Sequence, residues 1–98
     1  MKEGKKSPED VTLETNVNKI IGETIRAQRK KLKLSAAEIA FRANITRAYY
    51  GRIERPEVTA SHFILFKVSR ALGLDMNSLY KDTEEKVDEY LQKNLPDH

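Results

Sequence analysis

Residues 34–55, LSAAEIAFRANITRAYYGRIER, carry the pattern that decides the fold of this 98-residue chain. Ser35 precedes Glu38 by three positions, which is the spacing of a capping box, so a helix is predicted to begin directly after Ser35. Thr46 is a good N-cap for a second helix. Asn44 lies between the two and tolerates the left-handed conformation that a tight turn requires. The stretch is therefore predicted to form two short helices joined by a tight turn.

Helical patterns flank this stretch on both sides, and no segment has the pattern of a strand. The predicted helices cover residues 17–32, 36–43, 46–54, 62–72, 76–80 and 83–95. In the last of them Thr83 is expected to be the N-cap, and Pro96 follows the end. We therefore predict an all-α fold of five helices with an additional C-terminal helix, in which residues 36–54 form a helix-turn-helix.

Charge divides the chain into three segments. Residues 1–16 carry three lysines and four acidic residues, residues 17–80 twelve basic and five acidic residues, and residues 81–98 three lysines and six acidic residues. The first segment is polar and is predicted to be a flexible arm. Residues 17–80 are predicted to be the folded domain, and residues 81–98 an amphipathic helix and tail. The basic middle segment suits a polyanion such as nucleic acid, although an ordinary solvated surface explains the same excess.

The composition excludes several other kinds of protein. Cysteine is absent, so neither disulfides nor a thiolate metal site is available. No apolar run approaches the ~20 residues that a membrane span needs. The two histidines, His62 and His98, have no nucleophile or carboxylate in a catalytic arrangement around them. We expect a cytoplasmic protein that is not an enzyme, uses no cofactor or metal and has no membrane partner.

An apolar stripe marks the last predicted helix. Val87, Tyr90, Leu91 and Leu95 recur at helical spacing. A helix of about twelve residues is not stable alone, so we expect the stripe to pack on its own domain or on a second copy of the chain.

The joint spacing of residues 21–79 resembles the Xre/Cro-type helix-turn-helix family, the DNA-binding domain of many phage and bacterial repressors. The residues that carry this resemblance are Gly22, Ile25, Arg29, Leu34, Ser35, Glu38, Ile39, Ala40, Tyr49, Ile53, Glu54, Arg55, Ser61, Leu65, Val68, Ala71, Leu72 and Gly73. The resemblance implies a lambda-repressor-like fold and double-stranded DNA as the partner. It also implies that helix 46–54 is the recognition helix and enters the major groove.

The resemblance further assigns roles to individual positions. Arg29 and Glu54 match a salt bridge between the first and third helices. The positions implied to contact DNA bases are Arg47, Ala48, Gly51 and Arg52. Those implied to contact the DNA backbone are Lys30, Ser35, Ala36, Thr46, Tyr49 and Arg55, although the Tyr49 ring is equally well explained by packing. The chain departs from the family pattern at Ala36, where many members have a glutamine that binds a phosphate.

The function implied is that of a sequence-specific transcriptional regulator, most simply a repressor. One recognition helix covers only a few base pairs, so a homodimer on an inverted repeat is expected. The alternative is an antitoxin-like or adaptor protein whose main partner is another protein, bound through the acidic C-terminal segment.

Overall fold

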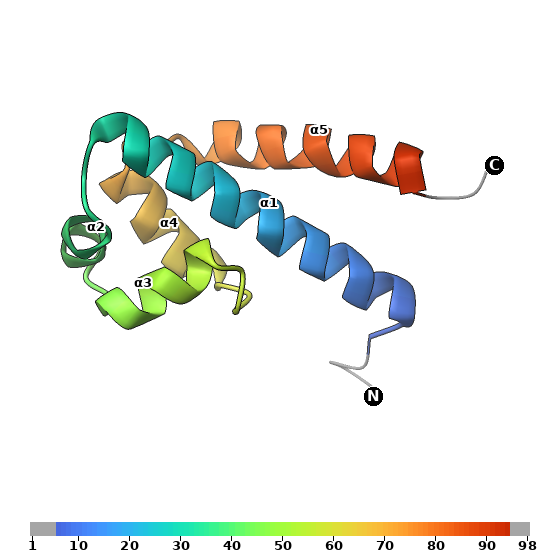
Figure 1. Cartoon of the computed structure of the whole chain (residues 1–98), viewed down its shortest axis with the longest axis horizontal. Coiled ribbons are helices and arrows are strands. Elements are labelled where there is room, and N and C mark those ends of the chain that lie inside the picture. The colour runs from blue at the N-terminus through green and yellow to red at the C-terminus, as the bar shows by residue number, and fades with distance from the viewer. Residues whose placement is uncertain (1–5, 95–98) are drawn as a thin grey trace.

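The computed structural model describes residues 6–94, and this part of the chain consists of five α-helices with no strand (Figure 1). The helices are α1 (Pro8–Leu32), α2 (Ala36–Ala43), α3 (Arg47–Glu54), α4 (His62–Ala71) and α5 (Met76–Asn94). The all-α prediction is confirmed. No helix among the described residues is long and apolar enough to cross a membrane.

The caps predicted at Ser35 and Thr46 and the turn predicted at Asn44 form as expected. The Ser35 hydroxyl accepts the Glu38 backbone N–H at 3.0 Å, and the Glu38 carboxylate accepts the Ser35 N–H at 2.8 Å, which completes the capping box. The hydroxyls of Thr46 and Ser61 each accept the backbone N–H three residues later, at 3.0 and 3.1 Å. Asn44 adopts the left-handed conformation, with φ 58° and ψ 48°. These interactions are local, and they determine the bounds of α2 and α3.

The first helix begins about two turns earlier than predicted. Ser7 is the N-cap, and its hydroxyl accepts the Asp10 N–H at 3.1 Å. Pro8 occupies the first helical position, where its missing N–H costs nothing, and the acidic side chain of Glu9 suits the positive end of the helix dipole. The flexible arm predicted for residues 1–16 is therefore wrong from Pro8 onward, because a complete start signal overrides the polar composition. Residues 1–5 lie outside the described part, and the division into domains stays a prediction.

The last two predicted helices are one continuous helix, α5, so the break predicted between residues 80 and 83 is wrong. Thr83, expected to be an N-cap, is buried in the middle of α5, and its hydroxyl donates to the Leu79 carbonyl at 2.8 Å. A threonine hydroxyl can bond to the carbonyl four residues earlier, so threonine can lie within a helix as well as at its N-cap. Leu95, the last residue of the apolar stripe, lies outside the described residues.

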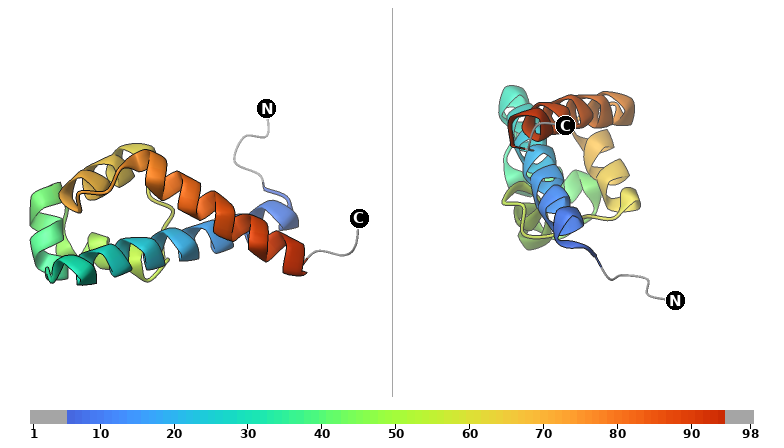
Figure 2. Two further views of the ribbon diagram at one scale, coloured as in Figure 1. Left: turned by 90° about the horizontal axis from the view of Figure 1, so that it is seen from above. Right: turned by 90° about the vertical axis from the view of Figure 1, so that its right-hand side faces the viewer.

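The helices form a body with a two-helix extension. In Figure 1, α2, α3 and α4 gather around the C-terminal half of α1, while the N-terminal half of α1 and the C-terminal half of α5 extend beyond them to the right. Figure 2 shows the same arrangement from two further sides, and α5 packs on α1. The buried core lies in the body and consists of Ile21, Ile25, Ile39, Ala40, Ala43, Tyr50, Ile53, Leu65, Val68 and Leu72.

Gly22 lets α1 and α3 approach each other closely. A Cβ atom at this position would lie 2.7 Å from the Ile53 carbonyl oxygen and 2.8 Å from the Glu54 carbonyl oxygen. A real side chain does not fit at those distances, so the glycine allows the C-terminal end of α3 to rest on the α1 backbone.

Candidate nucleic-acid interface

The short helix α3 has one buried face and one exposed face. Tyr50 is 0% exposed and Ile53 is 3% exposed, so these side chains fix α3 to the core. Arg47 and Arg52 are exposed on the opposite side, and Gly51 is half-buried. This division follows from the 3.6-residue period of a helix in which every third or fourth residue is apolar. The exposed face is free to meet a ligand.

A hollow of about 540 Å³ lies along this exposed face. It is lined by Arg26, Arg29, Ala36, Arg47, Ala48, Gly51, Arg52, Glu54 and Arg55. The four residues implied to contact bases are thus brought together, with Ala36 and Arg55 from the group implied to contact the DNA backbone. The other four of that group, Lys30, Ser35, Thr46 and Tyr49, do not line the hollow. Tyr49 is half-buried and packs against the core, which supports the packing explanation of its ring.

Positive charge dominates the lining. Five arginines contribute to it, and the single carboxylate among the lining residues is that of Glu54. Glu54 is paired with Arg29, and Arg55 is paired with Glu57, so the arginines at positions 26, 47 and 52 are left to set the electrostatic potential. A concave surface lined by one sign of charge attracts a ligand of the opposite sign, here a polyanion.

Arg29 and Glu54 join α1 to α3 by a bidentate ion pair. The Arg29 Nε donates to Glu54 Oε2 at 2.7 Å, and Nη2 donates to Oε1 at 3.0 Å. The remaining Nη1 donates to the Leu34 carbonyl at 3.1 Å, and the Tyr50 hydroxyl donates to Glu54 Oε2. This is the salt bridge that the family resemblance implied between the first and third helices. A fork-to-fork pair of this kind restrains both distance and direction.

The network remains charged at neutral pH. Burial alone would raise the pKa of the Glu54 carboxyl, but hydrogen bonds from Arg29 and Tyr50 outweigh it and lower this pKa below its ordinary value. The hydrogen bond with Glu54 raises the pKa of Arg29. Burial, reinforced by the bond to Glu54, raises the pKa of the Tyr50 hydroxyl, which therefore stays a donor. The orientation of α3 on α1 is thus stabilised by groups in fixed protonation states.

Arg26 is not among the predicted site residues, but the structure places it in the hollow. Arg26 precedes Arg29 by three residues, so both side chains leave α1 on the same side. This spacing could have identified Arg26 once Arg29 was placed against α3.

Comparison with known proteins decides the family. Residues 25–79, more than half of the chain, match the helix-turn-helix family. The chain belongs to the Xre/Cro-type helix-turn-helix family. This helix-turn-helix chain is 32% identical over 80 residues to the immunity repressor protein of Bacillus phage phi105, an alignment that covers 79% of the chain and 56% of that repressor. It thus spans just over half the length of this relative.

Solved structures show the same fold. The crystal structures of the clp gene regulator ClgR from Corynebacterium glutamicum superpose with TM-scores of 0.66 and 0.70 at 20% identity. The first match covers 71% of this chain and 91% of ClgR, and the second covers 81% and 85%. At this identity the likeness concerns the fold alone.

Proposed function

We propose that this helix-turn-helix chain is a sequence-specific transcriptional regulator that inserts α3 into the major groove and represses by covering promoter DNA. The observation that carries the proposal is the arginine-lined hollow on the exposed face of α3, whose orientation is fixed by the pair between Arg29 and Glu54. The phage repressor among the relatives supports it. A rigid recognition helix with free guanidinium groups is suited to reading base edges.

Arg47 is the first candidate for reading a base, and Arg52 is the second. Both side chains are exposed and line the hollow. A guanidinium fork matches O6 and N7 of guanine, and a good bidentate pair discriminates by about 1–3 kcal/mol. Ala48 lies next to Arg47 and offers a methyl group to a thymine methyl.

Other residues are proposed to hold the DNA backbone without reading it. Lys30 is exposed at the basic C-terminal end of α1, and the N-termini of α2 and α3 begin at Ser35 and Thr46. Helix N-termini favour phosphate because their first N–H groups are unpaired and the helix dipole is positive there. Ala36 lines the hollow but contributes only its backbone N–H.

Two alanine variants separate reading from positioning. Arg47→Ala should abolish the preference at one base pair, a loss of discrimination of roughly 10- to 100-fold. Lys30→Ala should weaken binding to all sequences alike and reduce the salt dependence, because each phosphate contact adds about −0.9 to the slope of log K against log salt. The measurement is selection from random DNA at about 0.15 M salt, followed by affinity measurements on single-base variants.

The same selection tests the function itself. A shared motif recovered by the unmodified chain supports a regulator. If no motif emerges and the chain instead forms a tight complex with another protein, the antitoxin-like or adaptor function is the correct one. If both variants weaken all sequences equally, the proposed division between Arg47 and Lys30 is wrong.

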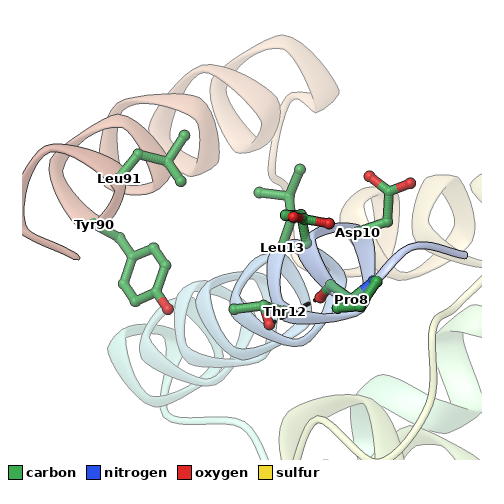
Figure 3. A pocket seen from close by; sticks show the side chains of 7 residues that line it. Pro8, Asp10, Thr12, Leu13, Tyr90 and Leu91 are labelled. Carbon is green, nitrogen blue, oxygen red and sulfur yellow. Dashed lines mark hydrogen bonds between the residues drawn. The ribbon is translucent and has the colours of Figure 1, made fainter. Parts of the chain in front are cut away.

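We further propose that two copies bind an inverted repeat, with their recognition helices about 34 Å apart in successive major grooves. The two-helix extension offers a surface for this contact. Leu13 of α1 and Leu91 of α5 border a mostly apolar hollow of about 440 Å³, also lined by Pro8 and Tyr90 (Figure 3). Packing of α5 on α1 leaves Val11 50% exposed and Leu13 38% exposed.

Sedimentation equilibrium and the symmetry of the selected motif test the dimer. The unmodified chain should be dimeric and select a palindrome. Leu13→Lys should shift the equilibrium to monomer while keeping the helical circular dichroism signal, because Leu13 is already partly exposed. If Leu13→Lys is as dimeric as the unmodified chain, the interface lies elsewhere. If the unmodified chain is a monomer that selects a single half-site, the proposed dimer is wrong.

A further inference from the structure

The side chain of Arg55 folds back over Gly51. Arg55 is the C-cap of α3 and lies one turn after Gly51. A Cβ atom built on Gly51 would lie 2.9 Å from Arg55 Nη1 and 3.6 Å from both Cζ and Nη2. The guanidinium therefore occupies the space that a side chain at position 51 would fill. Its charge lies one turn nearer the N-terminal end of α3 than its own Cα does.

Glu57 anchors this guanidinium from one side. Arg55 Nε donates to Glu57 Oε2 at 2.9 Å, and this hydrogen bond raises the pKa of Arg55 and lowers that of Glu57. Nε belongs to one edge of the planar guanidinium, whereas Nη1 and Nη2 together form the end of the fork. Anchoring through Nε therefore orients the group and leaves the Nη1–Nη2 end for a ligand.

The Arg55 guanidinium lies on the same face of α3 as the residues proposed to contact bases. Arg47, Gly51 and Arg55 follow one another at four-residue spacing, so they form one row along α3. All three line the same hollow as Ala48 and Arg52. Arg55 thus presents its fork beside these residues rather than away from α3.

We propose that Arg55 determines DNA sequence specificity: its guanidinium, laid over Gly51 and oriented by Glu57, donates two parallel hydrogen bonds to O6 and N7 of one guanine. This inference rests on the proposed function and deepens it. It changes two of the roles implied by the resemblance, since Arg55 reads a base instead of holding the backbone. Gly51 contributes by having no side chain, which leaves room for the guanidinium.

The carboxylate of Glu57 is the reason to favour a base over a phosphate. A side chain that binds phosphate acts mainly through its positive charge, and an adjacent carboxylate opposes that attraction. Recognition of guanine depends instead on two donors held in one plane at a fixed direction. Pairing Arg55 with Glu57 therefore weakens the attraction to a phosphate and improves the fixed orientation that guanine recognition needs.

The test compares the unmodified chain with Arg55→Ala, Glu57→Gln and Gly51→Ala, on DNA sites that differ by one base pair. Arg55→Ala should reduce the preference for one guanine by roughly 10- to 100-fold and leave the preferences at other positions unchanged. Glu57→Gln should weaken the preference at the same position while raising the affinity for all sequences, because it removes a negative charge near DNA. Gly51→Ala should weaken that preference too, since its methyl group displaces the guanidinium.

Lys93→Ala, a change of the same charge at an exposed position of α5, is the matched control and should alter no preference. Circular dichroism checks that each variant is folded. A uniform loss of affinity in Arg55→Ala would show a phosphate contact and overturn the inference while leaving the proposed function intact. Unchanged preference in Glu57→Gln would overturn the anchoring. If the unmodified chain itself selects no motif, the proposed function fails and the inference fails with it.

Discussion

Replacing Glu54 with alanine should lower the free energy of unfolding by about 2–4 kcal/mol, because breaking a buried ion pair by removing one partner leaves the other charge uncompensated. The Arg29 side chain is 16% exposed and that of Glu54 is 10% exposed, so water replaces the lost interaction only in part. The Tyr50 hydroxyl also loses its acceptor. Denaturant unfolding followed by circular dichroism measures the change.

Glu57→Ala is the matched control for this prediction. It also removes a glutamate that pairs with an arginine, but the side chains of Arg55 and Glu57 are 61% and 50% exposed. Exposed ion pairs contribute little, so the unfolding midpoint should stay close to that of the unmodified chain. An unchanged midpoint in Glu54→Ala would show that the pair between α1 and α3 is unimportant for stability.

The contribution of Glu54 should also depend on pH. Its pKa in the folded chain lies below the ordinary value of 4.5, so the folded state binds this proton less readily than the unfolded state does. The stabilisation is complete above pH 4.5 and is lost as the pH falls through the lower, folded-state pKa. Glu54→Gln lacks this titration. The stability difference between the unmodified chain and Glu54→Gln should therefore narrow in acid, and a constant difference would contradict the prediction.

Gly22→Ala should destabilise the fold by roughly 2 kcal/mol, although alanine is the better helix former by about 0.5–1 kcal/mol. The added methyl group would lie 2.7 and 2.8 Å from the carbonyl oxygens of Ile53 and Glu54. These are backbone atoms, which cannot rotate away, so α3 must shift on α1. Thermal and denaturant unfolding measure the loss, and DNA affinity should fall with it because the recognition helix is displaced.

Gly51→Ala, in contrast to Gly22→Ala, is not expected to lower the stability of the fold. Its methyl group would meet the Arg55 guanidinium, with Nη1 at 2.9 Å, and this exposed side chain can rotate aside at the cost of only a surface ion pair with Glu57. The variant should be as stable as the unmodified chain or up to about 1 kcal/mol more stable. If both alanine variants stabilise the fold, the close approach of α1 and α3 at Gly22 is not a constraint.

Local signals in the sequence were sufficient for most of the fold. The bounds of α2 and α3 follow from Ser35, Asn44 and Thr46, whose hydrogen bonds reach only three or four residues along the chain. The same kind of signal is present at Ser7 and Pro8, where the polar composition of residues 1–16 predicts a flexible arm instead. The error at Thr83 has a different cause, because the same hydroxyl can cap a helix or bond within one, and here Thr83 is buried and bonds to the Leu79 carbonyl.

The candidate site likewise has features that the sequence indicates and features that depend on tertiary packing. The family resemblance implied which residues of α3 face outward, and helical periodicity is the physical reason that the exposed Arg47 and Arg52 lie opposite the buried Tyr50. The family resemblance also implied that Arg29 pairs with Glu54. Only the tertiary structure decided that Arg26 shares the hollow and that the carbonyls of α3 touch Gly22. Periodicity and capping act within one helix, whereas these contacts depend on how two helices pack, which no spacing along one helix specifies.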